Sequence, residues 1–121
     1  MTAVRVLLVD DVEDVRRDLR TVLTLSGNIE IVGEAANGLE AIRLTESLQP
    51  EVVLMDLEMP VMDGYEAIRQ IKSHFPCMVI ALTVHDYESA HLKAKQAGVD
   101  AFLVKGAPVQ RIVQTISKQK E

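Results

Sequence analysis

The chain has 121 residues, of which 48% are hydrophobic and 26% are charged, so it can form one domain with a substantial core. A net charge of -5 argues against direct binding to nucleic acid, because contact with a phosphate backbone requires a basic surface. No apolar stretch approaches the roughly 18 residues of a membrane span and the N-terminus lacks the features of a signal peptide, so we expect a cytoplasmic protein with no membrane partner.

Short runs of β-branched and aliphatic residues alternate with longer segments that have the period of a helix. The short runs predict strands at 4–9, 30–36, 51–55, 78–82 and 101–104. One face of the first helical segment carries Val12, Val15, Leu19, Val22 and Leu23. Five strands alternating with five helices predict an α/β fold whose parallel sheet is covered on both faces, because parallel strands need crossover connections. We therefore expect residues 1–121 to form a single doubly wound (βα)5 sandwich.

Two features of the second half of the chain stand out. The helical segment at 87–97 offers only a narrow apolar stripe, formed by Ala90, Ala94 and Ala97. That helix should therefore be the least firmly anchored of the five. Cys77 is the only cysteine, which excludes an internal disulfide bond and a CxxC motif, and we expect it to be a buried hydrophobic residue.

Polar residues end four of the predicted strands. They are Asp10 and Asp11 after the first strand, Asp56 after the third, Thr83 after the fourth and Lys105 after the fifth. In doubly wound sheets the ligand site lies beyond the carboxyl ends of the strands, so these groups should converge there. Clustered carboxylates repel one another, which should raise the pKa of at least one of them and favour a cation with hard oxygen ligands. The sequence therefore predicts a Mg²⁺ site with Lys105 beside it.

Each of these residues also has an ordinary structural interpretation. An aspartate at a strand end more often caps a helix, and Asp10 or Asp11 can cap the helix that begins near Val12. Taken alone, Thr83 is an ordinary strand residue and Lys105 is a solvated lysine. Their occurrence together at corresponding positions favours a site. For Asp63, before Gly64 and a helix, capping is the better interpretation, and we expect His74 and His91 to be surface residues.

These motifs resemble the receiver domain of two-component response regulators over nearly the whole chain. The resemblance rests on LLVDD at 7–11, VLMDLEMPVMDG at 53–64, ALT at 81–83 and FLVK at 102–105. It implies a flavodoxin-like sheet with the strand order 2-1-3-4-5. The segment IEIVGEAANGLEAI at 29–42 is similar to the subfamily whose members usually carry a C-terminal helix-turn-helix DNA-binding domain.

The resemblance also implies roles for individual residues. Asp56 matches the phosphoacceptor, which takes a phosphoryl group from a sensor histidine kinase or a phosphotransfer protein. Asp11 and Asp56 match side-chain ligands of Mg²⁺, Asp10 a ligand acting through water, and Glu58 a ligand through its backbone carbonyl. Pro60 and Gly64 would turn the chain so that this carbonyl faces the metal. Three further positions carry implied roles: catalysis by Lys105, catalysis and switching by Thr83, and switching by Phe102.

The expected activity is that of a signalling switch, which catalyses only its own phosphorylation and dephosphorylation. A phosphorylation-linked homodimer is one expected output, and DNA would be reached only through an output domain absent from this chain. Gly106 stands where many receivers have proline, so the cis peptide usual there is in doubt. The side chains of Glu58 and His85 match positions that flank the path of the hydrolytic water. The alternative is a degenerate receiver-like interaction module that is not phosphorylated.

Overall fold

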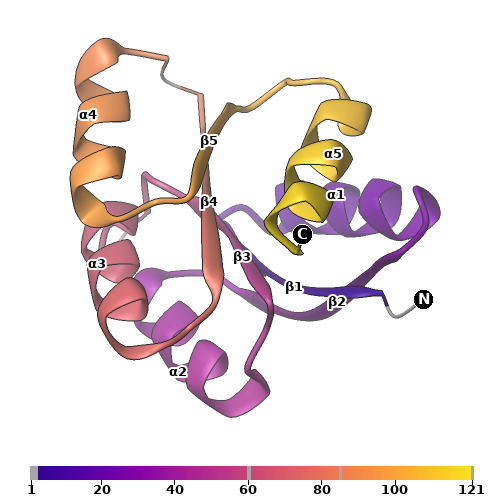
Figure 1. The fold of residues 1–121 in the computed structure, drawn as a ribbon, viewed down its shortest axis with the longest axis horizontal. Coiled ribbons are helices and arrows are strands. Elements are labelled where there is room, and N and C mark those ends of the chain that lie inside the picture. Colours follow the sequence, from indigo (N-terminus) through magenta and orange to yellow (C-terminus); the bar gives the residue numbers. More distant parts are fainter. Residues whose placement is uncertain (1–2, 60, 85, 121) are drawn as a thin grey trace.

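The computed structural model describes residues 3–59, 61–84 and 86–120, and the described residues form ten alternating elements (Figure 1). The strands are β1 (Val4–Val9), β2 (Ile29–Ala35), β3 (Val52–Asp56), β4 (Met78–Thr83) and β5 (Ala101–Val104). The helices are α1 (Glu13–Leu25), α2 (Gly38–Leu48), α3 (Gly64–His74), α4 (Glu88–Ala97) and α5 (Val109–Lys120). The strands pair in parallel in the order β2-β1-β3-β4-β5, which confirms the predicted sheet and strand order.

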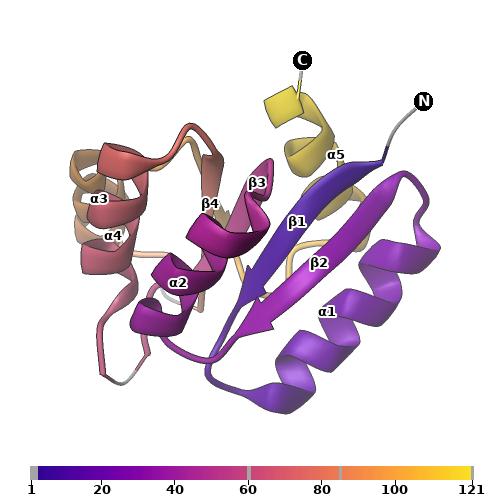
Figure 2. The same cartoon turned by 90° about the horizontal axis from the view of Figure 1, so that it is seen from below.

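Successive side chains of each strand point to opposite faces of the sheet, and this divides the core into two layers. In β1, Val6 and Leu8 pack with residues of α1 and α5, whereas Leu7 and Val9 pack with residues of α2, α3 and α4. Figures 1 and 2 show the same division, with α1 and α5 on one side of the sheet and the other three helices on the opposite side. The central strands β1 and β3 are therefore apolar on both faces, as expected for a covered parallel sheet.

The segment before α1 departs from the predicted pattern. Val12 was expected on the buried face of the helix, but it is 47% exposed. It occupies the N-cap position with an extended backbone, and the helix begins only at Glu13, so helical periodicity does not apply to it. Leu23 is fully buried, and Val15, Leu19 and Val22 are partly buried. The prediction for this face was therefore wrong only at its first residue.

The strand β2 carries one irregularity. Its register with β1 shifts between Val6, which pairs with Ile31, and Leu7, which pairs with Gly33. The extra residue is Val32, so the strand contains a bulge. Because Leu8 faces α1 and pairs with Glu34, the bulge places Glu34 on the face of the sheet that α1 covers.

The helix α4 buries only Ala90, Ala94 and Ala97, which confirms the expected narrow stripe. Cys77 is buried, also as predicted. Within the described part of the chain no helix has the length and apolarity needed to cross a membrane.

Candidate functional site at the carboxyl edge of the sheet

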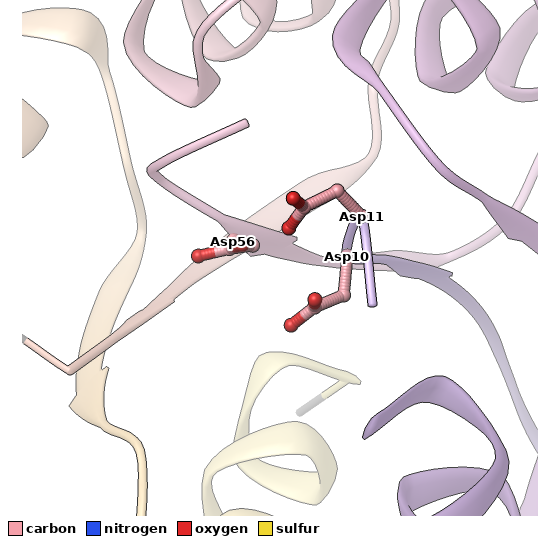
Figure 3. Close-up of side chains that lie close together, drawn as sticks. All are labelled: Asp10, Asp11 and Asp56. Atoms are coloured by element: carbon pink, nitrogen blue, oxygen red, sulfur yellow. The ribbon is translucent and has the colours of Figure 1, made fainter. Parts of the chain in front are cut away.

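Three carboxylates meet beyond the ends of β1 and β3 (Figure 3). One carboxylate oxygen from each of Asp10, Asp11 and Asp56 lies within 4.8 Å of the other two. Asp10 and Asp56 are only 2% and 5% exposed, whereas Asp11 is exposed to solvent. Adjacent parallel strands end side by side, which is why residues 45 positions apart in the sequence share one site. The set of hard oxygen donors fits Mg²⁺.

The ammonium group of Lys105 reaches this cluster from the end of β5. Its Nζ lies 2.7 Å from Oδ2 of Asp10 and 3.5 Å from Oδ1 of Asp56. The Lys105 backbone N–H donates to the carbonyl oxygen of Thr83 at 2.6 Å, which fixes the start of the loop after β5. The next residue, Gly106, has a φ of +95°, a conformation that favours glycine. None of the peptide bonds in the described residues is cis.

The pKa values reflect this burial and pairing. Burial raises the pKa of the Asp56 carboxyl to about 6, against the lowering effect of the Lys105 charge and with a further increase from the charge of Asp10. Burial lowers the pKa of Lys105, but the hydrogen bond to Asp10 and the charges of Asp56 and Asp10 outweigh it, so the net shift is upward. Repulsion within the cluster was expected to raise a carboxyl pKa, and the direction is confirmed. The larger cause, however, is burial.

The hydroxyl of Thr83 lies beside the cluster, at the end of β4. It is 1% exposed and its Oγ1 donates to Oε1 of Glu58 at 3.3 Å. The Glu58 backbone N–H donates to Oδ1 of Asp56 at 3.3 Å. Glu58 therefore contacts Asp56 through its backbone and Thr83 through its side chain. The role of its carbonyl oxygen as a metal ligand stays a prediction.

The loop after β3 is held by Asp63 and Gly64. The Asp63 side chain accepts a hydrogen bond from the N–H of Glu66, which confirms it as the cap of α3. A Cβ atom at Gly64 would lie 2.3 Å from the carbonyl oxygen of Asp56, so only glycine allows this close approach. The predictions for Pro60 and His85 lie outside the described residues.

Phe102 lies on β5, farther from the carboxylates. It pairs with Ala81 of the neighbouring strand β4. Ala81 lies two residues before Thr83, so Phe102 and Thr83 face the same side of the sheet. His91 of α4 stacks on the Phe102 ring with centroids 3.7 Å apart and lies 2.5 Å from Asp86. His91 was predicted to be a surface residue and is exposed, but its contact with Phe102 was not foreseen.

The alternative roles of the acidic pair are also decided by hydrogen bonds. Asp10 Oδ1 accepts from the N–H of Val12 at 2.9 Å, which stabilises the turn before α1. The N-cap residue of α1 is Val12, so neither aspartate is the N-cap residue of that helix. The carbonyl oxygen of Asp10 accepts from Arg16, which the sequence did not single out. The available signal was weak: a basic residue one turn into the helix that follows two aspartates.

Comparisons with known proteins agree with this geometry. The family model described as response regulator receiver domain matches residues 6–117. The response regulator protein VraR of Staphylococcus aureus is 40% identical over 116 residues, which are 95% of this chain and 56% of VraR. The chain spans about half the length of several curated relatives it matches.

Two solved structures are similar over almost the whole chain. The signal receiver domain of the response regulator NarL from Mycobacterium tuberculosis has a TM-score of 0.94 and 33% identity, covering 99% of this chain and 98% of that one. A DNA-binding response regulator of the LuxR family from Staphylococcus aureus has a TM-score of 0.91 and 32% identity, covering 98% of this chain and 99% of that one. The second relationship, to a regulator described as DNA-binding, agrees with the subfamily predicted from residues 29–42.

The raised pKa of Asp56 predicts how stability depends on pH in the absence of metal. The folded chain binds a proton on Asp56 up to about pH 6, whereas the ordinary value is 3.8, so the free energy of unfolding falls as pH rises between these values. Ionised Asp56 then costs at most about 3 kcal/mol. In EDTA, Asp56→Asn should gain stability relative to wild type by about 1 kcal/mol between pH 5 and 7.5, measured by urea denaturation.

The matched control for this experiment is Asp11→Asn, which removes an exposed carboxylate of the same cluster. Both variants remove one carboxylate from the cluster but only Asp56→Asn removes the buried one, so comparing their pH profiles isolates the effect of burial. Parallel pH profiles for wild type and Asp56→Asn would show that burial of Asp56 carries no such cost.

Proposed function

Since this chain belongs to the family of response regulator receiver domains, we propose that it is the phosphorylation-dependent switch of a two-component system, with Asp56 as phosphoacceptor. The observation that carries the proposal is the meeting of the Asp56 carboxylate with two further carboxylates and the Lys105 ammonium at one sheet edge. We propose that residues 1–121 form one receiver domain, supported by the single five-stranded sheet and the family match over 6–117.

The proposed reaction is transfer of a phosphoryl group from a phosphohistidine. A carboxylate oxygen of Asp56 forms a bond to phosphorus while the bond between phosphorus and the histidine nitrogen breaks, which releases the histidine of the kinase or phosphotransfer protein. Lys105 Nζ lies 3.5 Å from Asp56 Oδ1 and would pair with an oxygen of the transferring group. Catalysis of this kind is mainly positioning and electrostatic stabilisation.

The acidic cluster would hold Mg²⁺. Asp11 and Asp56 would be side-chain ligands, Asp10 would act through water, and Glu58 would contribute its backbone carbonyl. The bound cation would neutralise negative charge on the carboxylates and the incoming phosphoryl group. Asp10 is held by Lys105 and by the Val12 N–H, so the metal would enter a partly prepared site.

The switch would begin at Thr83. Its hydroxyl donates to Glu58 at 3.3 Å, and a dianionic phosphoryl group on Asp56 would offer a stronger acceptor nearby. Movement of Thr83 would leave space behind it, into which Phe102 could repack. The thin apolar contact of α4 suits a surface that shifts between two states, and dimerisation is one output. Sedimentation with and without beryllofluoride tests this output, and equal association in both states would contradict it.

The proposed setting is the cytoplasm, where a sensor histidine kinase would supply the phosphoryl group. The similar LuxR-family regulator is described as DNA-binding. In this protein, binding to DNA would belong to an output domain, and the acidic receiver itself would not bind nucleic acid. The catalytic role is limited to the domain's own phosphorylation and dephosphorylation. A degenerate interaction module fits less well, because it would not require this set of groups at one edge.

Phosphorylation of Asp56 is tested by intact mass after incubation with acetyl phosphate and Mg²⁺. Wild type should gain the mass of one phosphoryl group, and Asp56→Asn should gain none while keeping its fold, because an amide cannot form the acyl phosphate. Asp11→Asn, which keeps the nucleophile, serves as control and should still be labelled, though slowly. Full labelling of Asp56→Asn would exclude this assignment, and no labelling of wild type would favour the degenerate module.

Metal binding is tested by thermal unfolding. Millimolar Mg²⁺ should raise the wild-type melting temperature by a few degrees, because a ligand that binds only the folded state stabilises it by mass action. Asp11→Ala should lose this response. Asp18→Ala, which removes an exposed carboxylate of α1 outside the cluster, should keep it. A wild-type melting temperature that Mg²⁺ leaves unchanged would contradict the proposed site.

The lifetime of the phosphorylated state is expected to depend on Glu58. Its carboxylate lies at the Thr83 hydroxyl, beside the predicted path of the hydrolytic water. If it positions that water, Glu58→Ala should lengthen the lifetime a few-fold to tenfold, on the order of 1 kcal/mol of barrier. The measurement is decay of phosphorylated protein after removal of acetyl phosphate, with Glu58→Gln as the control that removes only the charge. A shorter lifetime in both variants would show instead that the charge repels water.

A further inference from the structure

We propose that Arg16 is a positioning residue for the acidic metal site, an inference that rests on the proposed function. Arg16 lies in the first half of α1 and its side chain is only 14% exposed. Its Nη1 donates to the backbone carbonyl oxygen of Asp10 at 2.6 Å, and its Nε donates to Oε1 of Glu34 at 3.1 Å. One guanidinium group therefore joins α1, β2 and the end of β1.

The bond to Asp10 fixes the peptide group between the two aspartates of the site. The carbonyl of Asp10 belongs to the peptide unit that links Asp10 to Asp11, so its direction sets the backbone from which the Asp11 side chain departs. Asp10 is also held through its side chain by Lys105 and the Val12 N–H. Asp11 is exposed and has little packing around it, so its placement depends mainly on this backbone. Arg16 would thus orient the more exposed of the two aspartates.

The bulge in β2 completes the arrangement. It places Glu34 on the face covered by α1, where α1 runs alongside the strand (Figure 2). There Glu34 accepts from Arg16 through Oε1 and from Arg20 through Oε2, at 3.1 and 2.9 Å. The carboxylate holds the planar guanidinium of Arg16 in the orientation in which its Nη1 meets the Asp10 carbonyl. Glu34 and Arg16 together form an outer shell that supports the predicted ligands.

Positioning and simple electrostatics predict opposite results. Arg16 carries a positive charge close to the site, so its removal should strengthen cation binding if charge alone mattered. If Arg16 holds the peptide between the two aspartates, its removal should weaken binding despite the more negative surroundings. Arg20 provides a matched control, because it carries the same charge and pairs with the same Glu34 carboxylate from a more exposed position.

The experiment measures the dissociation constant of Mg²⁺ alone, by titration calorimetry or by melting temperature against Mg²⁺ concentration, with phosphoryl donors absent. Arg16→Met, which removes the donors but keeps much of the apolar stem, should raise the constant about tenfold. Arg20→Met should change it less than twofold. Arg16→Lys keeps the charge, but a single ammonium group replaces the planar guanidinium that donates to both Asp10 and Glu34. This variant should therefore also bind Mg²⁺ more weakly.

The outcomes separate this inference from the proposed function. Wild type that does not bind Mg²⁺ would overturn both. If wild type binds Mg²⁺ and Arg16→Met binds it equally or more tightly, only the role of Arg16 would be overturned. Equal weakening by Arg16→Met and Arg20→Met would also overturn it, because the effect would then come from the pairing with Glu34 that both arginines share and not from the bond of Arg16 to Asp10. If Arg16→Met does not fold, Arg16→Lys decides, because it keeps the positive charge and removes the fork of donors: it should weaken Mg²⁺ binding, and unchanged affinity overturns the inference.

Discussion

The burial of two carboxylates costs free energy, and this cost determines much of the structure around them. Asp10 follows β1 and Asp56 ends β3, the other residues of these strands lie mostly in the core, and both carboxylates are almost fully buried. A buried carboxylate loses its hydration and must be compensated by hydrogen bonds, by an opposite charge or by protonation. All three are present: the N–H groups of Val12 and Glu58 donate to these carboxylates, Lys105 pairs with them, and the pKa of Asp56 is raised. For Asp56 the compensation is partial, because its pKa stays raised despite the charge of Lys105. Asp56 is therefore the group on which a bound cation or phosphoryl group would have most effect.

The topology of the sheet supplies the convergence that this chemistry needs. In a parallel sheet all strands run in the same direction, so β1, β3, β4 and β5 end at one edge although their last residues are far apart in the sequence. The two covered faces keep these strands rigid and apolar up to their ends. The polar groups therefore begin where the core stops, which concentrates them at the carboxyl edge of a rigid sheet. The close approach of Gly64 to Asp56 shows that the following loop is packed against this edge as well.

Much of this arrangement follows from sequence, because it depends on local pattern. Strand boundaries differ from the predicted ones by no more than one residue, and the four polar strand ends identified the Asp10, Asp11 and Asp56 cluster and Lys105 beside it. What could not be predicted depends on register or on side-chain contacts between distant elements. The position of Glu34 opposite Arg16 requires the bulge at Val32; the adjacent Gly33 is a weak sequence signal for a bulge, but it does not fix the register. The stacking of His91 on Phe102 depends on how α4 lies over β5, which a stripe of three alanines does not determine.

The contacts of Thr83 explain how one site can combine a fixed centre with a movable output. Its backbone carbonyl accepts from Lys105 and belongs to the sheet, so it holds the lysine in place whatever the side chain does. Its hydroxyl donates to the Glu58 side chain, a contact between side chains that can change without a change in the sheet. The same residue therefore serves the rigid part through its backbone and the adjustable part through its side chain. In the proposed switch, a rearrangement that starts at the hydroxyl would spread toward Phe102 and the weakly buried α4. The ion pair of Lys105 with Asp10, at 2.7 Å, lies outside this path, so it would not have to break for the surface of α4 to change.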